Sequence, residues 1–167
     1  MDSEFFKRIL AGTAVAEESS YLIQTRHWGS AITLDANTRV NSIEGEPSLH
    51  FHRHRTEEYI LYSGLMTVYR GEYFDGDLKR TVASLVGTEL RPGDKVVIHP
   101  NVVHIPINKA SEGSVFIEVS HGPYEDSDIV RVYDKTGRDA ALSAAWTTLG
   151  VNPGIGVEDL IRSLNTR

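Results

Sequence analysis

Residues 44–64 read EGEPSLHFHRHRTEEYILYSG, and this stretch indicates both the fold and the chemistry. His50, His52 and Glu57 follow the spacing H-x-H-x4-E. Side chains of an extended strand alternate between its two faces, so His50, His52 and also His54 are expected to project the same way. Two imidazoles on one face, with a carboxylate returning from the next turn of chain, supply three corners of a metal site.

Residues 92–108, PGDKVVIHPNVVHIPIN, supply the fourth ligand, His104. A Pro-Gly-Asp turn opens this run, and His104 follows a tight bend at Pro100 and Asn101. Asn suits such a bend because it tolerates left-handed backbone better than most residues. Three imidazoles and one carboxylate fit one divalent ion, with Mn or Zn placed first and Fe, Co or Ni as alternatives. The other interpretation is that some of these histidines are hydrogen-bonded core residues.

Together the two stretches resemble the paired motifs of the cupin family, over about residues 45–108. The first motif of that family ends H-x-H-x4-E-x6-G, and the second has P-G-D followed by a His and an Asn four residues apart. Asn101 stands where the second motif usually has Gly. His99 stands where it usually has Pro, and is therefore not expected to be a ligand. The resemblance implies an all-β jelly-roll barrel, the cupin β-barrel.

The rest of the pattern agrees with a single domain over residues 1–167. Short β-branched and aromatic runs, broken by Gly, Pro, Asn and Asp, predict a barrel core over about residues 21–135 with no helices between its strands. An apolar stripe predicts a short helix within residues 2–18. Residues 139–167 are expected to form a helical extension, with one helix capped by Asp139 and a last amphipathic helix.

Composition excludes several classes of protein. The formal net charge of -6 offers no basic stripe for nucleic acid. The chain has no cysteine, which excludes disulfides and thiolate chemistry. No apolar run approaches the roughly 18–20 residues that cross a bilayer. The first residues lack the positive bias of a signal peptide, so a cytoplasmic protein without a membrane partner is expected. Because small cupins expose sheet edges that need covering, we also expect a homodimer.

A more specific resemblance extends over about residues 26–138. These segments are similar to the type II mannose-6-phosphate isomerase domain: Arg26-His27-Trp28-Gly29, Ser48-Leu49-His50, residues 52–59, Ser63-Gly64, Ile117-Glu118-Val119, Gly122, Tyr124, Asp128-Ile129-Val130-Arg131, Asp134 and Gly137-Arg138. His50 replaces a Gln of that family, which gives three histidines, as in the cupin-type D-lyxose isomerases. Tyr59 replaces its Trp, and Thr136 replaces a Tyr in the tail motif.

This resemblance implies a metal-dependent aldose–ketose isomerase that acts through a cis-enediol on a mannose-like sugar, D-mannose or D-lyxose, or on mannose 6-phosphate. The reaction needs a Lewis acid and an acid/base near C1 and C2 of the sugar. Glu118, within an apolar strand, is the first candidate for the base if it faces inward rather than into solvent. Lys95 and His54 are the next candidates, with two alternatives open for each: a side chain that faces the cavity or one on the surface.

Substrate contacts are expected from three further residues. Arg131 and Arg138 can hold sugar hydroxyls or a phosphate, or can pair with Asp128 and Asp134. Tyr59 is the third. Two other functions stay open at this stage: a cupin dioxygenase with iron on the same ligands, and a non-catalytic sugar-binding cupin.

Overall fold

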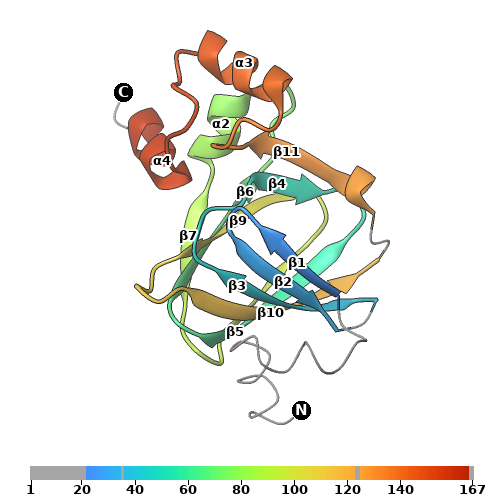
Figure 1. Cartoon of the computed structure of the whole chain (residues 1–167). Helices are drawn as coiled ribbons and strands as arrows, with labels where there is room; N and C mark the ends of the chain where they lie inside the picture. The colour runs from blue at the N-terminus through green and yellow to red at the C-terminus, as the bar shows by residue number, and fades with distance from the viewer. Residues whose placement is uncertain (1–21, 35, 123–124, 166–167) are drawn as a thin grey trace.

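The strands form two antiparallel sheets (Figure 1). The computed structural model describes residues 22–34, 36–122 and 125–165, so the helix predicted within residues 2–18 lies outside the described residues. The strands are β1 (Leu22–Arg26), β2 (Gly29–Thr33), β3 (Thr38–Ile43), β4 (Leu49–His52), β5 (Thr56–Ser63), β6 (Met66–Glu72), β7 (Val86–Leu90), β8 (Lys95–Ile98), β9 (Val102–Asn108), β10 (Ser114–His121) and β11 (Ile129–Tyr133).

The larger sheet has the order β1-β2-β3-β10-β5-β8, and the smaller has β11-β4-β9-β6-β7. In both sheets, each strand runs antiparallel to the neighbours in this order. The predicted all-β class is therefore confirmed. The homodimer expected from the sequence stays a prediction.

One apolar core fills part of the space between the two sheets. Along β5, alternate side chains point into this space. Glu57, Tyr59 and Leu61 are buried, whereas Glu58 and Ile60 between them are only partly buried. The buried members of this core are Ile43, Tyr59, Leu61, Met66, Val68, Leu90, Val96, Ile98 and Phe116.

Three helices cover the outer face of the smaller sheet: α2 (Leu78–Ala83), α3 (Ala140–Thr148) and α4 (Val157–Asn165). The two C-terminal helices were predicted, and Asp139 caps α3 by accepting from the N–H of Leu142 at 3.0 Å. The expectation of no helix between the strands was wrong, because α2 interrupts the β6–β7 connection. Its N-cap Asp77 accepts from the N–H of Arg80, whereas the sequence around it indicates only a turn.

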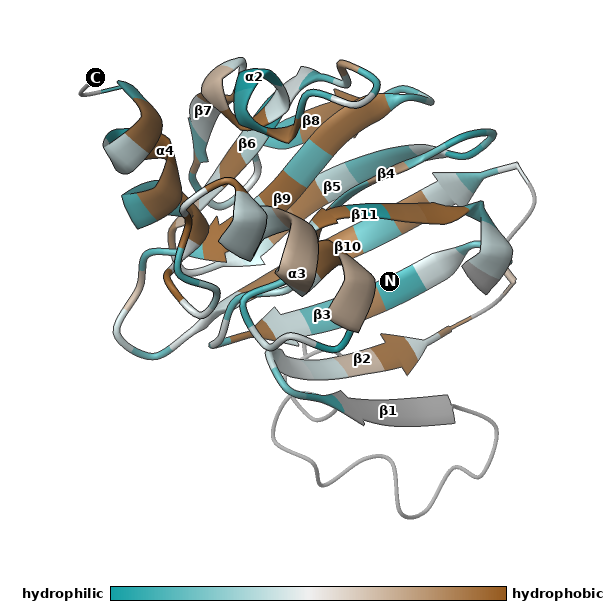
Figure 2. Ribbon diagram, turned by 90° about the horizontal axis from the view of Figure 1, so that it is seen from above, coloured by the Kyte–Doolittle hydropathy of each residue, from teal (hydrophilic) through white to brown (hydrophobic). Residues whose placement is uncertain are grey.

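The helices and the smaller sheet share a second apolar core. Its buried residues are Leu49, Phe51, Val82, Leu85, Val103, Ile105, Ile107, Val132, Tyr133, Trp146, Val151, Val157 and Leu160. Figure 2 looks down on this region and shows hydrophobic segments in β9 and β11 beside α3. In the described part of the chain, no helix has the length and apolar character needed to span a membrane.

This second core determines which way β4 faces. Leu49 and Phe51 pack toward the helices, so the alternating residues His50 and His52 lie on the opposite face of the strand, toward the larger sheet. In the same way, Val103 and Ile105 of β9 belong to the helix side. The helical extension thus buries one face of the two strands that carry the histidines.

We predict that Trp146→Ala destabilises the protein by about 3–5 kcal/mol, the range for truncating a buried aromatic residue. Trp146 is 1% exposed, donates from Nε1 to the carbonyl of Val132 at 2.8 Å and packs edge-on against Tyr133. Denaturant unfolding measures the change in the free energy of unfolding. The control Leu149→Ala, at a residue 37% exposed, should change it by less than about 1 kcal/mol. Equal effects of the two substitutions would contradict this account of the extension.

Candidate metal centre

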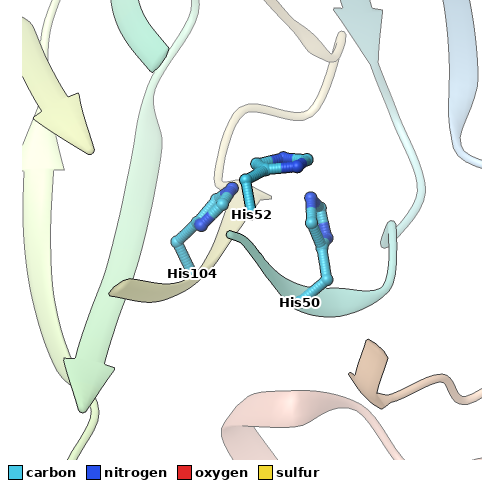
Figure 3. Close-up of side chains that lie close together, drawn as sticks. All are labelled: His50, His52 and His104. Atoms are coloured by element: carbon cyan, nitrogen blue, oxygen red, sulfur yellow. The ribbon is translucent and has the colours of Figure 1, made fainter. Parts of the chain in front are cut away.

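Three histidines converge on the inner face of the smaller sheet (Figure 3). His50 and His52 come from β4 and His104 from β9, and His50 and His104 are direct partners across the two strands. The ring centroids lie 4.6 Å apart for His50 and His104, 5.0 Å for His50 and His52 and 5.5 Å for His52 and His104. One nitrogen from each ring lies within 4.8 Å of the other two, so one ion can contact all three.

Backbone carbonyls fix the tautomer of two of these rings. Nδ1 of His50 lies 2.8 Å from the carbonyl oxygen of Ser48, and Nδ1 of His104 lies 3.0 Å from that of Val102. A carbonyl only accepts, so each Nδ1 carries the hydrogen and each Nε2 keeps its lone pair. Nε2 of His104 is buried and has no hydrogen-bond partner among the described residues. A buried polar atom in this state fits a site for a cation.

Glu57 completes the candidate ligand set from β5. Its Oε1 lies 3.0 Å from Nε2 of His52, and its Oε2 lies 3.2 Å from Nε2 of His104. Ligand atoms about 2.1 Å from a common ion are about 3 Å apart when they are neighbours at a right angle, so both separations suit shared coordination. Tyr59 donates from its hydroxyl to Oε2 at 2.8 Å, and Nε of Arg55 lies 3.2 Å from Oε1.

Protonation states in the cluster also suit a divalent ion. Burial, followed by the neighbouring His104 and His52, holds the pKa of His50 well below its usual value, so this ring is neutral. Burial alone would raise the pKa of Glu57, but the close contacts of its carboxylate with His104 and His52 outweigh burial and hold that pKa well below its usual value. Neutral imidazoles and an ionised carboxylate are the forms that bind metals.

A bend links the two motifs that supply the ligands. Asn101 has a φ of 64°, in the left-handed region, as its place after Pro100 predicted. Its N–H donates to the carbonyl oxygen of His52 at 2.7 Å. The bend therefore ties the start of β9 to the end of β4, next to two of the histidines.

A cavity of about 410 Å³ opens beside the cluster. Five arginines line it together with the two carboxylates Glu57 and Glu118, although the whole chain has a net charge of -6. The residues that line the cavity are Arg26, Trp28, Ala31, Arg39, Asn41, Ile43, Pro47, Ser48, His50, His52, Arg55, Glu57, Tyr59, Pro106, Phe116, Glu118, Ile129, Arg131 and Arg138.

Glu118 of β10 lies on the wall of this cavity, in the inward orientation that was expected from the sequence. Asn41 donates to its Oε2 at 3.0 Å, and the hydroxyl of Ser120 lies 3.4 Å from its Oε1. Burial, followed by the negative charge of Glu57, raises the pKa of Glu118 to about 7. A carboxyl group with such a pKa can both take up and release a proton near neutral pH.

Solved structures share this architecture. The chain is similar to the capsular polysaccharide assembling protein CapF from Staphylococcus aureus, with a TM-score of 0.56 and 16% identity over 72% of this chain and 33% of CapF. It is similar to the Drosophila melanogaster CENP-C cupin domain, with a TM-score of 0.54 and 13% identity over 72% of this chain and all of that domain. The chain has a cupin fold.

Other comparisons add little to this assignment. The L-ribose isomerase of Cellulomonas parahominis gives a TM-score of 0.49 with 18% identity, over 58% of each chain. This chain spans about a third of the length of CapF, and identities this low show the fold alone. No family model and no curated protein matches the sequence. The resemblance to the type II mannose-6-phosphate isomerase domain therefore rests on its motifs.

Two of the predicted catalytic residues do not face the cupin cavity. Lys95 is opposite Ile60 in the β5–β8 register, on the outer face, and its exposed ammonium pairs with Glu58 at 3.4 Å. His54 is exposed because β4 ends at His52, so strand alternation stops before it reaches His54. Of the two alternatives that the sequence left open, the structure therefore shows the surface position for both residues, and their choice as catalytic candidates is corrected.

The three predicted substrate contacts all line the cavity. Arg131 is opposite His50 in the β4–β11 register, which explains its inward placement. Arg138 pairs with Asp134 at 2.7 Å, which is one of the two alternatives left open by the sequence, and it also lines the cavity. Tyr59 is buried against Phe116, and its hydroxyl is engaged by Glu57. Their roles toward a substrate stay predictions.

Sequence reasoning missed several residues of the site. Arg55 is buried with 3% of its side chain exposed, and its Nη2 lies 2.8 Å from Nδ1 of His52. Arg39 and Asn41 reach the cavity from β3, a strand that no sequence motif marked. Only for Arg55 did the sequence offer an indication. It lies between His52 and Glu57 of the H-x-H-x4-E motif, in the turn between β4 and β5, and is therefore close to both ligands.

We predict that His104→Ala loses the bound divalent ion, because His104 supplies an Nε2 without another partner at the centre of the cluster. Elemental analysis of the purified variant, after loading with Mn or Zn, gives the metal content per chain. His99→Ala is the matched control, since His99 is exposed and should leave the metal content unchanged. Retention of a full equivalent of metal by His104→Ala would remove this residue from the ligand set.

Proposed function

We propose that this protein is a metal-dependent aldose–ketose isomerase whose substrate is a phosphorylated, mannose-like sugar. One observation carries the proposal: Glu118, with a pKa of about 7, shares one cavity with His50, His52 and Glu57. The buried His104 lies behind them, close to Glu57 and within reach of the same ion as the other two histidines. The motifs shared with type II mannose-6-phosphate isomerases and D-lyxose isomerases support the same reaction. His50, His52, Glu57 and His104 would hold the ion.

The residues present fit the demands of the reaction. A divalent ion, when bound, polarises the adjacent oxygens of C1 and C2. Ionised Glu118 takes the proton from C2 of the aldose and returns it to C1, while a hydroxyl proton passes from O2 to O1, so the transfer needs no other reactant. Asn41 holds the Glu118 carboxyl in place from β3. Aromatic and apolar residues of the wall, such as Phe116 and Ile43, limit the water around it.

The arginines favour an anionic substrate. Besides Arg55, next to the ligands, the cavity presents Arg26, Arg39, Arg131 and Arg138. A cavity that gathers positive charge within a chain of net charge -6 attracts anions selectively. Guanidinium groups donate two parallel hydrogen bonds to a phosphate. A sugar phosphate uses this charge, whereas a neutral sugar does not.

Incubating the metal-loaded protein with a panel of aldoses and their 6-phosphates tests the proposed function directly. Formation of the matching ketose supports it. Oxygen consumption with an iron-loaded protein and no isomerisation would indicate the dioxygenase instead. Sugar binding without turnover, at full metal content, would indicate a non-catalytic sugar-binding cupin.

We predict that Glu118→Gln lowers kcat by roughly 10²–10⁴-fold with metal content intact, because the amide keeps the shape of the side chain but cannot accept the proton. In the wild type, activity should rise with pH as Glu118 ionises. That rise is expected at or below pH 7, because a bound cation lowers the pKa of about 7. Turnover in heavy water, with deuterium incorporation at C1 or C2, measures both properties. Near wild-type turnover by the variant would exclude Glu118 as the base.

We predict that Arg131→Met raises KM for the 6-phosphate by roughly 10-fold or more and leaves KM for the unphosphorylated sugar nearly unchanged. A charge-assisted hydrogen bond contributes about 1.5–3 kcal/mol when it is sheltered from water, and the lower end applies to Arg131, which is exposed. Arg91→Met is the matched control, because Arg91 is exposed and pairs with Glu89 outside the cavity. Equal effects on both substrates would argue against a phosphate contact.

A further inference from the structure

Asp128 is a buried carboxylate that the proposed reaction does not use. It ends the short turn η1 (Asp126–Asp128), directly before β11, and is 4% exposed. The next residue, Ile129, is the register partner of His52. The pairing of β11 with β4 therefore places this carboxylate beside one of the candidate metal ligands.

The two oxygens of Asp128 have different surroundings. Oδ1 accepts from the backbone N–H groups of Arg53 and His54, each at 3.0 Å. Oδ2 is buried without a hydrogen-bond partner among the described residues and lies 3.6 Å from Nδ1 of His52. A buried carboxylate oxygen without a donor is costly, so a hydrogen on Nδ1 of His52 would stabilise this arrangement.

His52 differs from the other two histidines, whose Nδ1 atoms face backbone carbonyls. Nη2 of Arg55 lies 2.8 Å from its Nδ1 and 3.1 Å from its Nε2, and Oε1 of Glu57 lies 3.0 Å from its Nε2. A guanidinium only donates and an ionised carboxylate only accepts. The shorter arginine contact is to Nδ1 and the carboxylate faces Nε2, so the contacts fit an imidazole with its hydrogen on Nε2. In that tautomer, Nε2 cannot bind a cation.

We propose that Asp128 is a positioning residue: it accepts a hydrogen bond from Nδ1 of His52 and so holds this ring in the tautomer whose Nε2 binds the metal. The hydrogen moves from Nε2 to Nδ1, and the N–H of Arg55 that faced Nδ1 turns toward Glu57, which its Nε already contacts at 3.2 Å. A carboxylate behind a metal-binding histidine orients the ring and makes it a stronger ligand. The inference rests on the metal site of the proposed function and is independent of the isomerase reaction.

Asp128→Asn tests the proposal with little change of shape. The side-chain oxygen can still accept from the two N–H groups, so the amide nitrogen faces Nδ1 of His52 and donates to it. The hydrogen of the ring then stays on Nε2, the wrong tautomer. Zinc affinity should fall by about 10–100-fold, the usual effect of losing such a partner. Titration of the metal-free protein with Zn²⁺, in competition with a chelating indicator, measures this affinity.

Asp134→Asn is the matched control. Asp134 is another buried aspartate, 5% exposed, and its Oδ1 accepts from the N–H of Thr136 at 3.0 Å. Its contacts are with Thr136 and Arg138 rather than with a histidine, so zinc affinity should equal that of the wild type. Wild-type zinc affinity in Asp128→Asn would overturn the inference and leave the metal site standing. Failure of the wild type to bind Zn²⁺ or Mn²⁺ would overturn the site itself.

A measurement on the wild type does not depend on how the variant folds. The ¹⁵N shifts of the imidazole nitrogens in the zinc-loaded protein report which nitrogen of His52 carries the hydrogen. The proposal requires the hydrogen on Nδ1. A hydrogen on Nε2, with zinc bound elsewhere, would overturn it.

Discussion

The alternation of side chains along β4 is the constraint on which both the fold and the site depend. Leu49 and Phe51 are committed to the core beneath the helices, which leaves His50 and His52 for the opposite face. A shift of one residue in the pairing with β9 would exchange the two sets, bury two imidazoles under the helices and expose the apolar residues to the cavity. The C-terminal helices therefore contribute to the site indirectly, because they make the correct register the only one that buries Leu49 and Phe51.

Much of the fold could be predicted because its signals are local. Short strands, turn residues and the cap at Asp139 are each encoded within a few residues. The helix α2 could not be read in the same way. It has six residues, and Asp77 marks its start within a segment that is equally typical of a turn. The sequence pattern also did not predict that α3 and α4 pack on the smaller sheet. An apolar face indicates that a helix is buried, but it does not indicate which element covers that face.

Site residues could be predicted from the sequence where motif spacing determines their position, and could not where it does not. The histidines of β4 and β9 and Glu57 are fixed by motif spacing and strand alternation, and the structure gathers all four. Spacing left the placement of Lys95 and His54 open, because it depends on strand register and on where β4 ends. The contributions of Arg39 and Asn41 depend on the pairing of β3 with β10, a contact between segments far apart in sequence. Spacing within one segment carries no information about such a pairing.

The ionised form of Glu118, which the proposed reaction needs, is the form that destabilises the folded protein. Its pKa rises on folding from 4.5 to about 7, so the folded protein holds the proton more tightly than the unfolded chain does. The resulting stabilisation is complete below the unfolded pKa and is lost as the pH rises through about 7. One pH unit corresponds to about 1.4 kcal/mol, so ionising Glu118 costs about 3 kcal/mol more in the folded protein. Arg39 and Arg55 oppose this cost without removing it. A glutamine would fill the same space without this cost. A carboxyl group that the folded protein holds in its neutral form near pH 7, but that must ionise to act as a base, is consistent with a role in proton transfer.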